Sequence, residues 1–254
     1  MPIRRPTVTP DPVWIVPDWP APAQVRAIST SRRGGVSLPP FDTFNLGDHV
    51  GDCATAVAQN RHFLRKRLQL PSSPFWLRQV HGIEVVEVGD PLNRPVADAS
   101  YSRTPGEVCC VVTADCLPLL LCSEEGQWVA AVHAGWRGLA DGIVEATVRK
   151  MAQPADRLMA WLGPAIGPDV FEVGEEVRQR FLAKQPEADV AFRRSAPKRW
   201  LADIYLLARQ RLQRLGIQNI YGGQWCTYCE AEHFFSYRRD GVTGRMATLI
   251  WIEQ

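Results

Sequence analysis

The chain has 254 residues, of which 46% are hydrophobic and 22% charged, so it can bury a large core and is too apolar to be disordered as a whole. Its 29 basic and 27 acidic residues nearly balance, which gives no electrostatic case for nucleic-acid or membrane binding. No apolar run suits a secretory leader or a membrane helix, and the odd number of cysteines, seven, favours a reducing compartment. We therefore expect a cytoplasmic protein without nucleic-acid or membrane partners. The absence of a long heptad pattern favours a monomer.

The first quarter of the chain is expected to hold an arm, a strand, a long loop and a helix. Residues 1–15 belong to a proline-rich stretch that should form an extended arm. A strand from about residue 24 runs into a Gly-Gly turn, and a loop rich in turn residues follows at 39–52. Apolar residues then recur at helical spacing, which predicts a helix from about Asp52 to Leu68.

The middle of the chain contains three apolar runs that are typical of buried strands, at residues 76–88, 107–122 and 127–138. After Gly138 the spacing of apolar residues becomes helical and stays so as far as Met151. These patterns predict several buried strands followed by a helix that ends near Met151.

The last hundred residues alternate between strand and helix patterns. Strands are predicted at 158–163, 217–223 and 246–252, and helices at 174–182 and 202–216. The second of these helices should begin after Asp203 as its N-cap and end at Gly216. We find no repeat or linker, so we expect one α/β domain of the α+β type over residues 1–254. Its mixed central β-sheet or sheets should be flanked by helices.

Three residues, each close to a glycine or proline that interrupts an apolar run, form the main candidate site: His81, Cys116 and His133. Two imidazoles and one thiolate suit Zn²⁺, and three protein ligands leave a position for water or substrate. The same atoms also suit a Cys116 nucleophile with either histidine as its base, and Asp115 is a candidate to orient that base. A structural role for all three in the core is a further possibility, and spacing alone does not separate these readings.

Other residues are weaker candidates. Cys226 and Cys229 have the spacing of a redox or metal-binding pair, but no second pair accompanies them. Asn45 can cap a turn or bind a substrate. Four further residues have the chemistry to bind an anionic substrate or, alternatively, to face solvent: Arg61, Arg137, Ser236 and Arg238.

Several long segments resemble one bacterial family, among them "LRQVHG", "ADCLPLLLC", "AAVHAGWRGLADGI" and "FFSYRRDGVTGRMA". This family is known as laccase-like multicopper polyphenol oxidoreductases, as peptidoglycan editing factors and as purine nucleoside phosphorylase-like proteins. The resemblance runs from about Val16 to Ile252. It implies a fold similar to that of cysteine–histidine deamidase toxins. It also implies that His81, Cys116 and His133 are both metal ligands and catalytic residues, with zinc as the usual metal.

Copper has also been proposed for this family, but a laccase needs several copper centres, and the chain has only five histidines. The resemblance instead implies phosphorolysis of the purine nucleosides adenosine, inosine and methylthioadenosine, with phosphate as co-substrate, and deamination of adenosine. An acidic residue of the kind that deaminases place beside the metal is missing, the nearest in sequence being Glu84 and Asp115. One alternative is a hydrolase, a peptidoglycan editing amidase that removes L-Ser from UDP-MurNAc-L-Ser. Another is a metal-binding protein without enzymatic activity.

Overall fold

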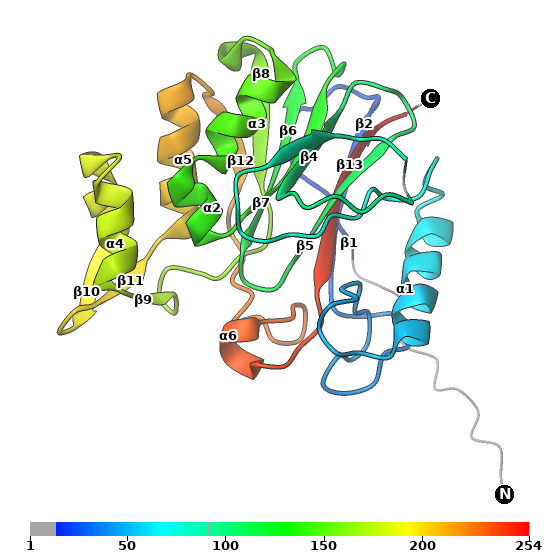
Figure 1. The fold of residues 1–254 in the computed structure, drawn as a ribbon, viewed down its shortest axis with the longest axis horizontal. Helices are drawn as coiled ribbons and strands as arrows, with labels where there is room; N and C mark the ends of the chain where they lie inside the picture. Colours follow the sequence, from blue (N-terminus) through cyan, green and yellow to red (C-terminus); the bar gives the residue numbers. More distant parts are fainter. Residues whose placement is uncertain (1–13, 91, 254) are drawn as a thin grey trace, which may run out of the picture.

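The structure, a computed structural model, describes residues 14–90 and 92–253. The predicted arm at 1–15 therefore lies almost wholly outside the described residues. Two β-sheets form the centre of the molecule (Figure 1). The larger one is mixed, because β12 pairs with β8 and β3 with β4 in parallel while the other pairs are antiparallel. Its strands, in spatial order, are β12 (Asn219–Gly222), β8 (Leu158–Leu162), β6 (Leu117–Ser123), β7 (Val129–Ala134), β4 (Ala99–Ser102) and β3 (Val85–Glu87).

The second central sheet is antiparallel and contains the last strand of the chain. Its strands, in spatial order, are β1 (Trp14–Ile15), β2 (Val25–Thr30), β13 (Met246–Ile252) and β5 (Val108–Thr113). Every residue of strand β5 is buried. Because alternate side chains point to opposite faces, the strand contributes to a core on each side of the sheet. Cys109 and Val111 pack with Leu120 and Ala131 of the larger sheet, whereas Cys110 belongs to a separate core on the opposite face.

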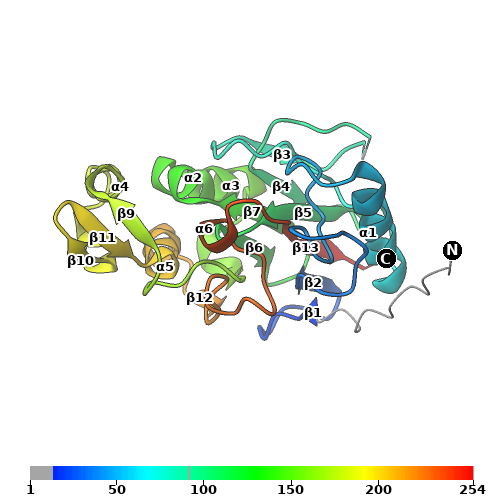
Figure 2. The ribbon, with the colours of Figure 1, turned by 90° about the horizontal axis from the view of Figure 1, so that it is seen from below.

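Helices cover the outer faces of both sheets (Figures 1 and 2). Helix α1 (Ala54–Arg67) packs Leu64 into the core on the outer face of the four-stranded sheet. The outer face of the six-stranded sheet carries α2 (Trp136–Asp141), α3 (Ile143–Met151) and α5 (Ile204–Leu215), together with the 3₁₀ turn η1 (Ala155–Arg157).

A small lobe projects beyond α5, and a short helix precedes the last strand (Figure 2). The lobe consists of α4 (Glu175–Leu182), the 3₁₀ turn η2 (Pro186–Ala191) and a sheet ordered β10 (Phe192–Ala196), β11 (Arg199–Ala202), β9 (Glu172–Gly174). The short helix is α6 (Tyr237–Asp240). Among the described residues, no helix combines the length and apolar character that crossing a bilayer requires.

The mixed α/β architecture and most predicted elements are confirmed. The helix that follows Asp203 begins with the Asp203 carboxylate accepting a hydrogen bond from Leu206 N at 2.9 Å, and its C-cap is Gly216 at φ +101°. Two predictions were wrong. Of the run 76–88 only Val85–Glu87 is a strand, and the helix expected after Gly138 is two helices separated by Gly142 at φ +113°.

A buried asparagine holds the long loop at 39–52 against α1. The side chain of Asn60 is inaccessible to solvent, accepts a hydrogen bond from Val36 N at 2.9 Å and donates to Asn45 O at 2.9 Å. We expect Asn60→Leu to reduce the free energy of unfolding by about 1–3 kcal/mol, because the loop groups lose partners that water cannot replace. Urea denaturation measures this, with Asn93→Leu at an exposed site as the matched control. Equal stability of the two variants would contradict the role given to Asn60.

Candidate metal centre

Three chain segments bring His81, Cys116 and His133 together. His133 lies in β7 opposite Pro118 of β6, and Cys116 immediately precedes β6 where the chain crosses from the smaller to the larger sheet. His81 follows a segment that bridges Arg78 to Val96, and its backbone adopts the left-handed conformation at φ +61°. This conformation is uncommon outside glycine and turns the imidazole toward the other two side chains.

The potential ligand atoms of these three residues all lie within 4.8 Å of one another. Cys116 Sγ is 3.8 Å from His81 Nε2, and the two imidazole centroids are 4.7 Å apart. Tetrahedral zinc with one sulfur and two nitrogen ligands separates its ligand atoms by roughly 3.5 Å, so small side-chain shifts suffice to accommodate the ion. The donor set, two nitrogens and one thiolate, also fits zinc.

A buried carboxylate, Asp98, organises both histidines. One of its oxygens lies 2.8 Å from His133 Nδ1 and accepts a hydrogen bond from His81 N at 2.9 Å. The other accepts from Gly82 N at 2.7 Å and from Val80 N at 3.2 Å. Because Nδ1 of His133 is engaged, its Nε2 is the atom available to a metal. A carboxylate that orients a ligand histidine in this way is a common support of zinc sites.

The electrostatic surroundings favour a thiolate on Cys116. Burial raises the pKa of the thiol, but the charge of His133 and hydrogen bonds from His133 and His81 outweigh burial and lower the pKa. Burial lowers the pKa of His133, but the Cys116 thiolate and Asp98 outweigh it and raise the pKa. Burial likewise raises the pKa of Asp98, yet its hydrogen bonds from His133 and the backbone lower it overall. In the metal-free site these interactions favour a thiolate on Cys116 together with an imidazolium on His133, whose Nδ1 contacts the Asp98 carboxylate.

This charge pattern predicts the pH dependence of Cys116 alkylation in metal-free protein. A lowered pKa means that the thiolate persists as pH falls below the range in which an ordinary thiol, with a pKa of about 8.5, is deprotonated. We expect the midpoint of the iodoacetamide rate to lie below that range, and to move up in His133→Asn. Peptide mapping of the Cys116 peptide measures the rate. The same midpoint in both proteins would contradict the pairing.

The backbone of Gly135 packs closely against the candidate metal ligands His81 and Cys116. A β-carbon at this position would lie 2.9 Å from His81 Cδ2 and 3.1 Å from Cys116 Sγ, although the backbone, at φ −61°, would itself accept alanine. We expect Gly135→Ala to weaken zinc binding by roughly 10-fold by displacing the ligands. A zinc-chelator competition measures this. Gly89→Ala, where an added β-carbon meets nothing within 4 Å, is the matched control, and equal affinities would contradict the prediction.

The centre opens into a cavity of about 500 Å³. The predicted residue Arg137 lines this cavity, and so does Arg245, which the sequence did not single out. Arg245 is held by hydrogen bonds from its guanidinium to the carbonyls of Thr243 and Gly244. Burial lowers its pKa, while the negative charge of Cys116 opposes this effect. The other lining residues are His49, Gln79, His81, Val112, Thr113, Ala114, Cys116, His133, Trp136 and Tyr237.

Four predicted substrate-binding residues lie outside the lining of this cavity. Asn45 is buried, and its amide donates to Gly47 O and Asp52 while accepting from the backbone N–H groups of Gly47 and Arg245. All its hydrogen-bonding positions are occupied, so a direct contact with substrate would require one of these bonds to break.

The remaining three are also engaged with the protein. Arg61 donates to Leu46 O and stacks 3.9 Å from the Trp76 ring centroid. Ser236 is buried and caps α6 by accepting from Arg239 N. The Arg238 guanidinium donates to Glu172 O. The structure thus joins only Arg137 of this set to the three central residues.

The carboxylate that supports the base differs from the sequence-based candidate. Asp115 accepts from Thr227 Oγ1 at 2.7 Å and from Arg238 N at 2.6 Å, and thereby anchors the loop before Cys116. Asp98, and not Asp115, is the carboxylate that contacts His133. The sequence marks Asp98 only weakly, as a single acid between two alanines.

A family model described as multi-copper polyphenol oxidoreductase laccase matches residues 26–253. The chain belongs to this family. Among laccase-like family members, a Shigella flexneri protein named purine nucleoside phosphorylase YfiH is 56% identical over 239 residues, covering 94% of this chain and 98% of the relative. A Pseudomonas aeruginosa protein named purine nucleoside phosphorylase PA4543 is 54% identical over 241 residues, with 94% and 98% coverage.

Solved structures agree with the fold. The crystal structure of Neisseria meningitidis protein NMB0706 matches with a TM-score of 0.92 at 48% identity, covering 95% of this chain and 99% of that one. The names of the curated relatives are those of enzymes, and this chain is an enzyme, so the non-enzymatic alternative is set aside. Among residues 14–90 and 92–253, only one group of three candidate ligands of this kind is found, which does not suit multicopper chemistry.

Proposed function

We propose that this chain is one zinc-dependent enzyme domain, a purine nucleoside phosphorylase acting on adenosine, inosine and methylthioadenosine, with adenosine deaminase activity. The observation that carries the proposal is the convergence of His81, Cys116 and His133 at a cavity that also presents Arg137 and Arg245. The names of the relatives supply the substrate class. We further propose that the enzyme is a cytoplasmic monomer, and that zinc rather than copper occupies the site.

The cavity combines the features that phosphorolysis requires. In this reaction a phosphate oxygen forms a bond to C1′ of the ribose while the C1′–N9 bond breaks, and the departing purine takes up a proton. Arg137 and Arg245 offer positive charge for the incoming phosphate. The volume of about 500 Å³ lies within the range of small-molecule sites. A bound zinc ion would supply Lewis-acid polarisation of a substrate atom or of a water molecule.

The protein's own residues hold this site in order. Asp98 fixes the orientation of His133 through Nδ1 and that of His81 through its backbone N–H. The Arg245 guanidinium is bonded to two backbone carbonyls. Its side chain is therefore already ordered, and phosphate binding costs little side-chain entropy there. The lowered pKa of Cys116 keeps a thiolate available as a ligand near neutral pH.

A chromatographic assay tests this function. Zinc-loaded protein is incubated with adenosine, with and without phosphate, and the products are identified. Adenine and ribose 1-phosphate that appear only with phosphate are expected, with inosine as the product of deamination. Adenosine that stays unchanged at full zinc occupancy, and inosine that stays unchanged when it replaces adenosine as substrate, would contradict the proposal.

The contact between Cys116 and the histidines favours a second candidate. A thiolate beside a histidine is the arrangement of a cysteine nucleophile, which suits amide hydrolysis. This supports the editing amidase that removes L-Ser from UDP-MurNAc-L-Ser. Serine release from that compound, compared with alanine release from the L-Ala form, measures the activity. No selective serine release would exclude it.

A further inference from the structure

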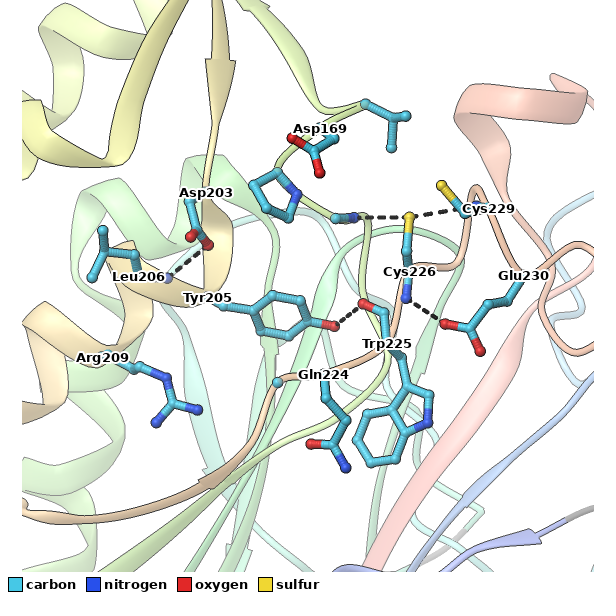
Figure 3. A pocket seen from close by; sticks show the side chains of 14 residues that line it. Asp169, Asp203, Tyr205, Leu206, Arg209, Gln224, Trp225, Cys226, Cys229 and Glu230 are labelled. Carbon is cyan, nitrogen blue, oxygen red and sulfur yellow. Dashed lines mark hydrogen bonds between the residues drawn. The ribbon is translucent and has the colours of Figure 1, made fainter.

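A pair of cysteines lies in another cavity, of about 380 Å³ (Figure 3). Cys226 and Cys229 follow β12, and both are free thiols. Cys226 is half-buried and Cys229 is exposed, so reagents in solution can reach the pair. Tyr205 and Trp225 line the same cavity. None of these residues lines the cavity of the metal centre.

The backbone holds Cys226 with its sulfur against two N–H groups. Its Sγ accepts hydrogen bonds from Gly167 N at 3.3 Å and from Cys229 N at 3.4 Å (Figure 3). Its own N–H donates to Glu230 at 2.7 Å, and the Tyr205 hydroxyl donates to Trp225 O at 2.9 Å. Hydrogen bonds to Tyr205, Gly167 and Glu230 therefore hold Trp225 and Cys226 in place.

The two cysteines are also joined directly, because the N–H of Cys229 donates to Cys226 Sγ. A hydrogen bond between the side chains raises the pKa of Cys229, with burial and the charge of Cys226 adding to the effect. Backbone donors at the first sulfur and a protonated second thiol are the arrangement in which the first cysteine attacks a disulfide and the second completes the exchange. The turn thus holds both thiols in one short segment, with backbone donors at Cys226 Sγ. Cys229 is exposed, so its sulfur can react without a rearrangement of the core.

We propose that Cys226 and Cys229 form a reversible intrachain disulfide by exchange with a low-molecular-weight disulfide such as oxidised glutathione. The Cys226 thiolate attacks one sulfur of that disulfide, forms a mixed disulfide and releases the first thiolate, which takes up a proton. Cys229 then loses its proton and attacks Cys226 Sγ, which releases the second thiol. Two protein thiols become one disulfide, and one small disulfide becomes two thiols.

The pair is linked to the metal centre by the residue that follows Cys226. Thr227 is buried, and its hydroxyl donates to Asp115 at 2.7 Å, immediately before Cys116. Its N–H is bonded to Ala165 O at 3.0 Å. Closing the ring between Cys226 and Cys229 changes the turn that contains Thr227 and so acts on the loop that presents Cys116. This coupling rests on the proposed metal site, whereas the disulfide itself does not.

Mass spectrometry of the full zinc-loaded chain tests the disulfide. After equilibration with mixtures of reduced and oxidised glutathione, free thiols are alkylated and tryptic peptide 215–238 is weighed, which contains Cys226 and Cys229 and no other cysteine. We expect the doubly alkylated peptide to be replaced, as the mixture becomes more oxidising, by an unalkylated peptide two hydrogens lighter than the free dithiol, and to return on reduction. In Cys229→Ser, glutathione should remain attached to Cys226. Two outcomes would overturn the proposal: separate glutathione adducts on both cysteines of the wild type, or thiols that stay free throughout. Cys53, an exposed cysteine outside the pair, shows what an adduct on an unpaired thiol looks like.

Zinc affinity tests the coupling independently of catalysis. Chelator competition is measured on reduced and oxidised protein, and again on Thr227→Val, which keeps both cysteines but lacks the hydroxyl donor to Asp115. We expect oxidation to weaken zinc binding by about 5-fold or more in the wild type, and by less in Thr227→Val. Equal zinc affinities of the reduced and oxidised wild type would overturn the coupling. Because neither readout uses nucleoside turnover, failure of the proposed activity would be distinguishable from failure here.

Discussion

Cys116→Ala is expected to lose both stoichiometric zinc and nucleoside phosphorolysis. Removing the thiolate leaves two imidazoles, and this loss should exceed the 10- to 100-fold effects seen when a residue that merely supports a ligand is changed. We therefore expect a fall in kcat/KM for adenosine of more than about 100-fold. The fold should survive, because the site lies at the edge of a cavity and Cys116 is only half-buried.

Metal analysis and steady-state kinetics on the same preparation measure this effect. Cys53→Ala, at an exposed cysteine before α1, is the matched control and should keep both zinc and activity. Cys116→Ala protein that retained one zinc per chain would show that the thiolate is not a ligand. Retained activity without zinc would show that the catalytic site lies elsewhere.

Asp98→Ala is expected to be the most destabilising single change at the site. The carboxylate is inaccessible to solvent and accepts hydrogen bonds from three backbone N–H groups as well as contacting His133. Removing it leaves these donors and a buried imidazole unpaired, which costs about 3–5 kcal/mol. Zinc affinity should fall by about 10- to 100-fold as well, because His81 and His133 lose their orientation.

The stability of Asp98→Ala should also depend on pH in a defined direction. The folded-state pKa of Asp98 is lowered, so its stabilisation is complete above the unfolded pKa of about 3.9 and is lost as pH falls through the folded value. The difference in unfolding free energy from the wild type should therefore be large at pH 7 and shrink in acid. Urea denaturation across pH measures it, with exposed Asp18→Ala as the control. A small, pH-independent difference would contradict the role of Asp98.

The sequence indicated the three central residues because each lies within two positions of a glycine or proline that interrupts an apolar run. It also indicated α5, because capping and helical spacing are local signals: Asp203 and Gly216 bound that helix as predicted. The segment 76–88 misled because most of it is a loop with single bridges, at Phe75 and Arg78, instead of a continuous ladder, and its Val80 and Ile83 are exposed. A run of apolar residues in the sequence does not distinguish such a loop from a strand.

The residues that support the site were hidden because they act across long sequence separations. Asp98 reaches His81 over 17 positions and His133 over 35, and nothing local marks it as their partner. Arg245 enters the cavity only because β13 pairs with β5, which places the C-terminal strand beside the loop that carries Cys116. Arg61 and Arg238 had suitable chemistry, yet their guanidinium groups bind backbone carbonyls. Such partners follow from the tertiary fold.

The most direct test of the central claim is a zinc titration of metal-free protein followed by the rate of ribose 1-phosphate formation from adenosine and phosphate. The arrangement of His81, Cys116 and His133 predicts that the rate rises in proportion to added zinc and levels off at one zinc per chain. Metal-free protein that was as active as the zinc-loaded form would contradict the assignment of this centre to catalysis.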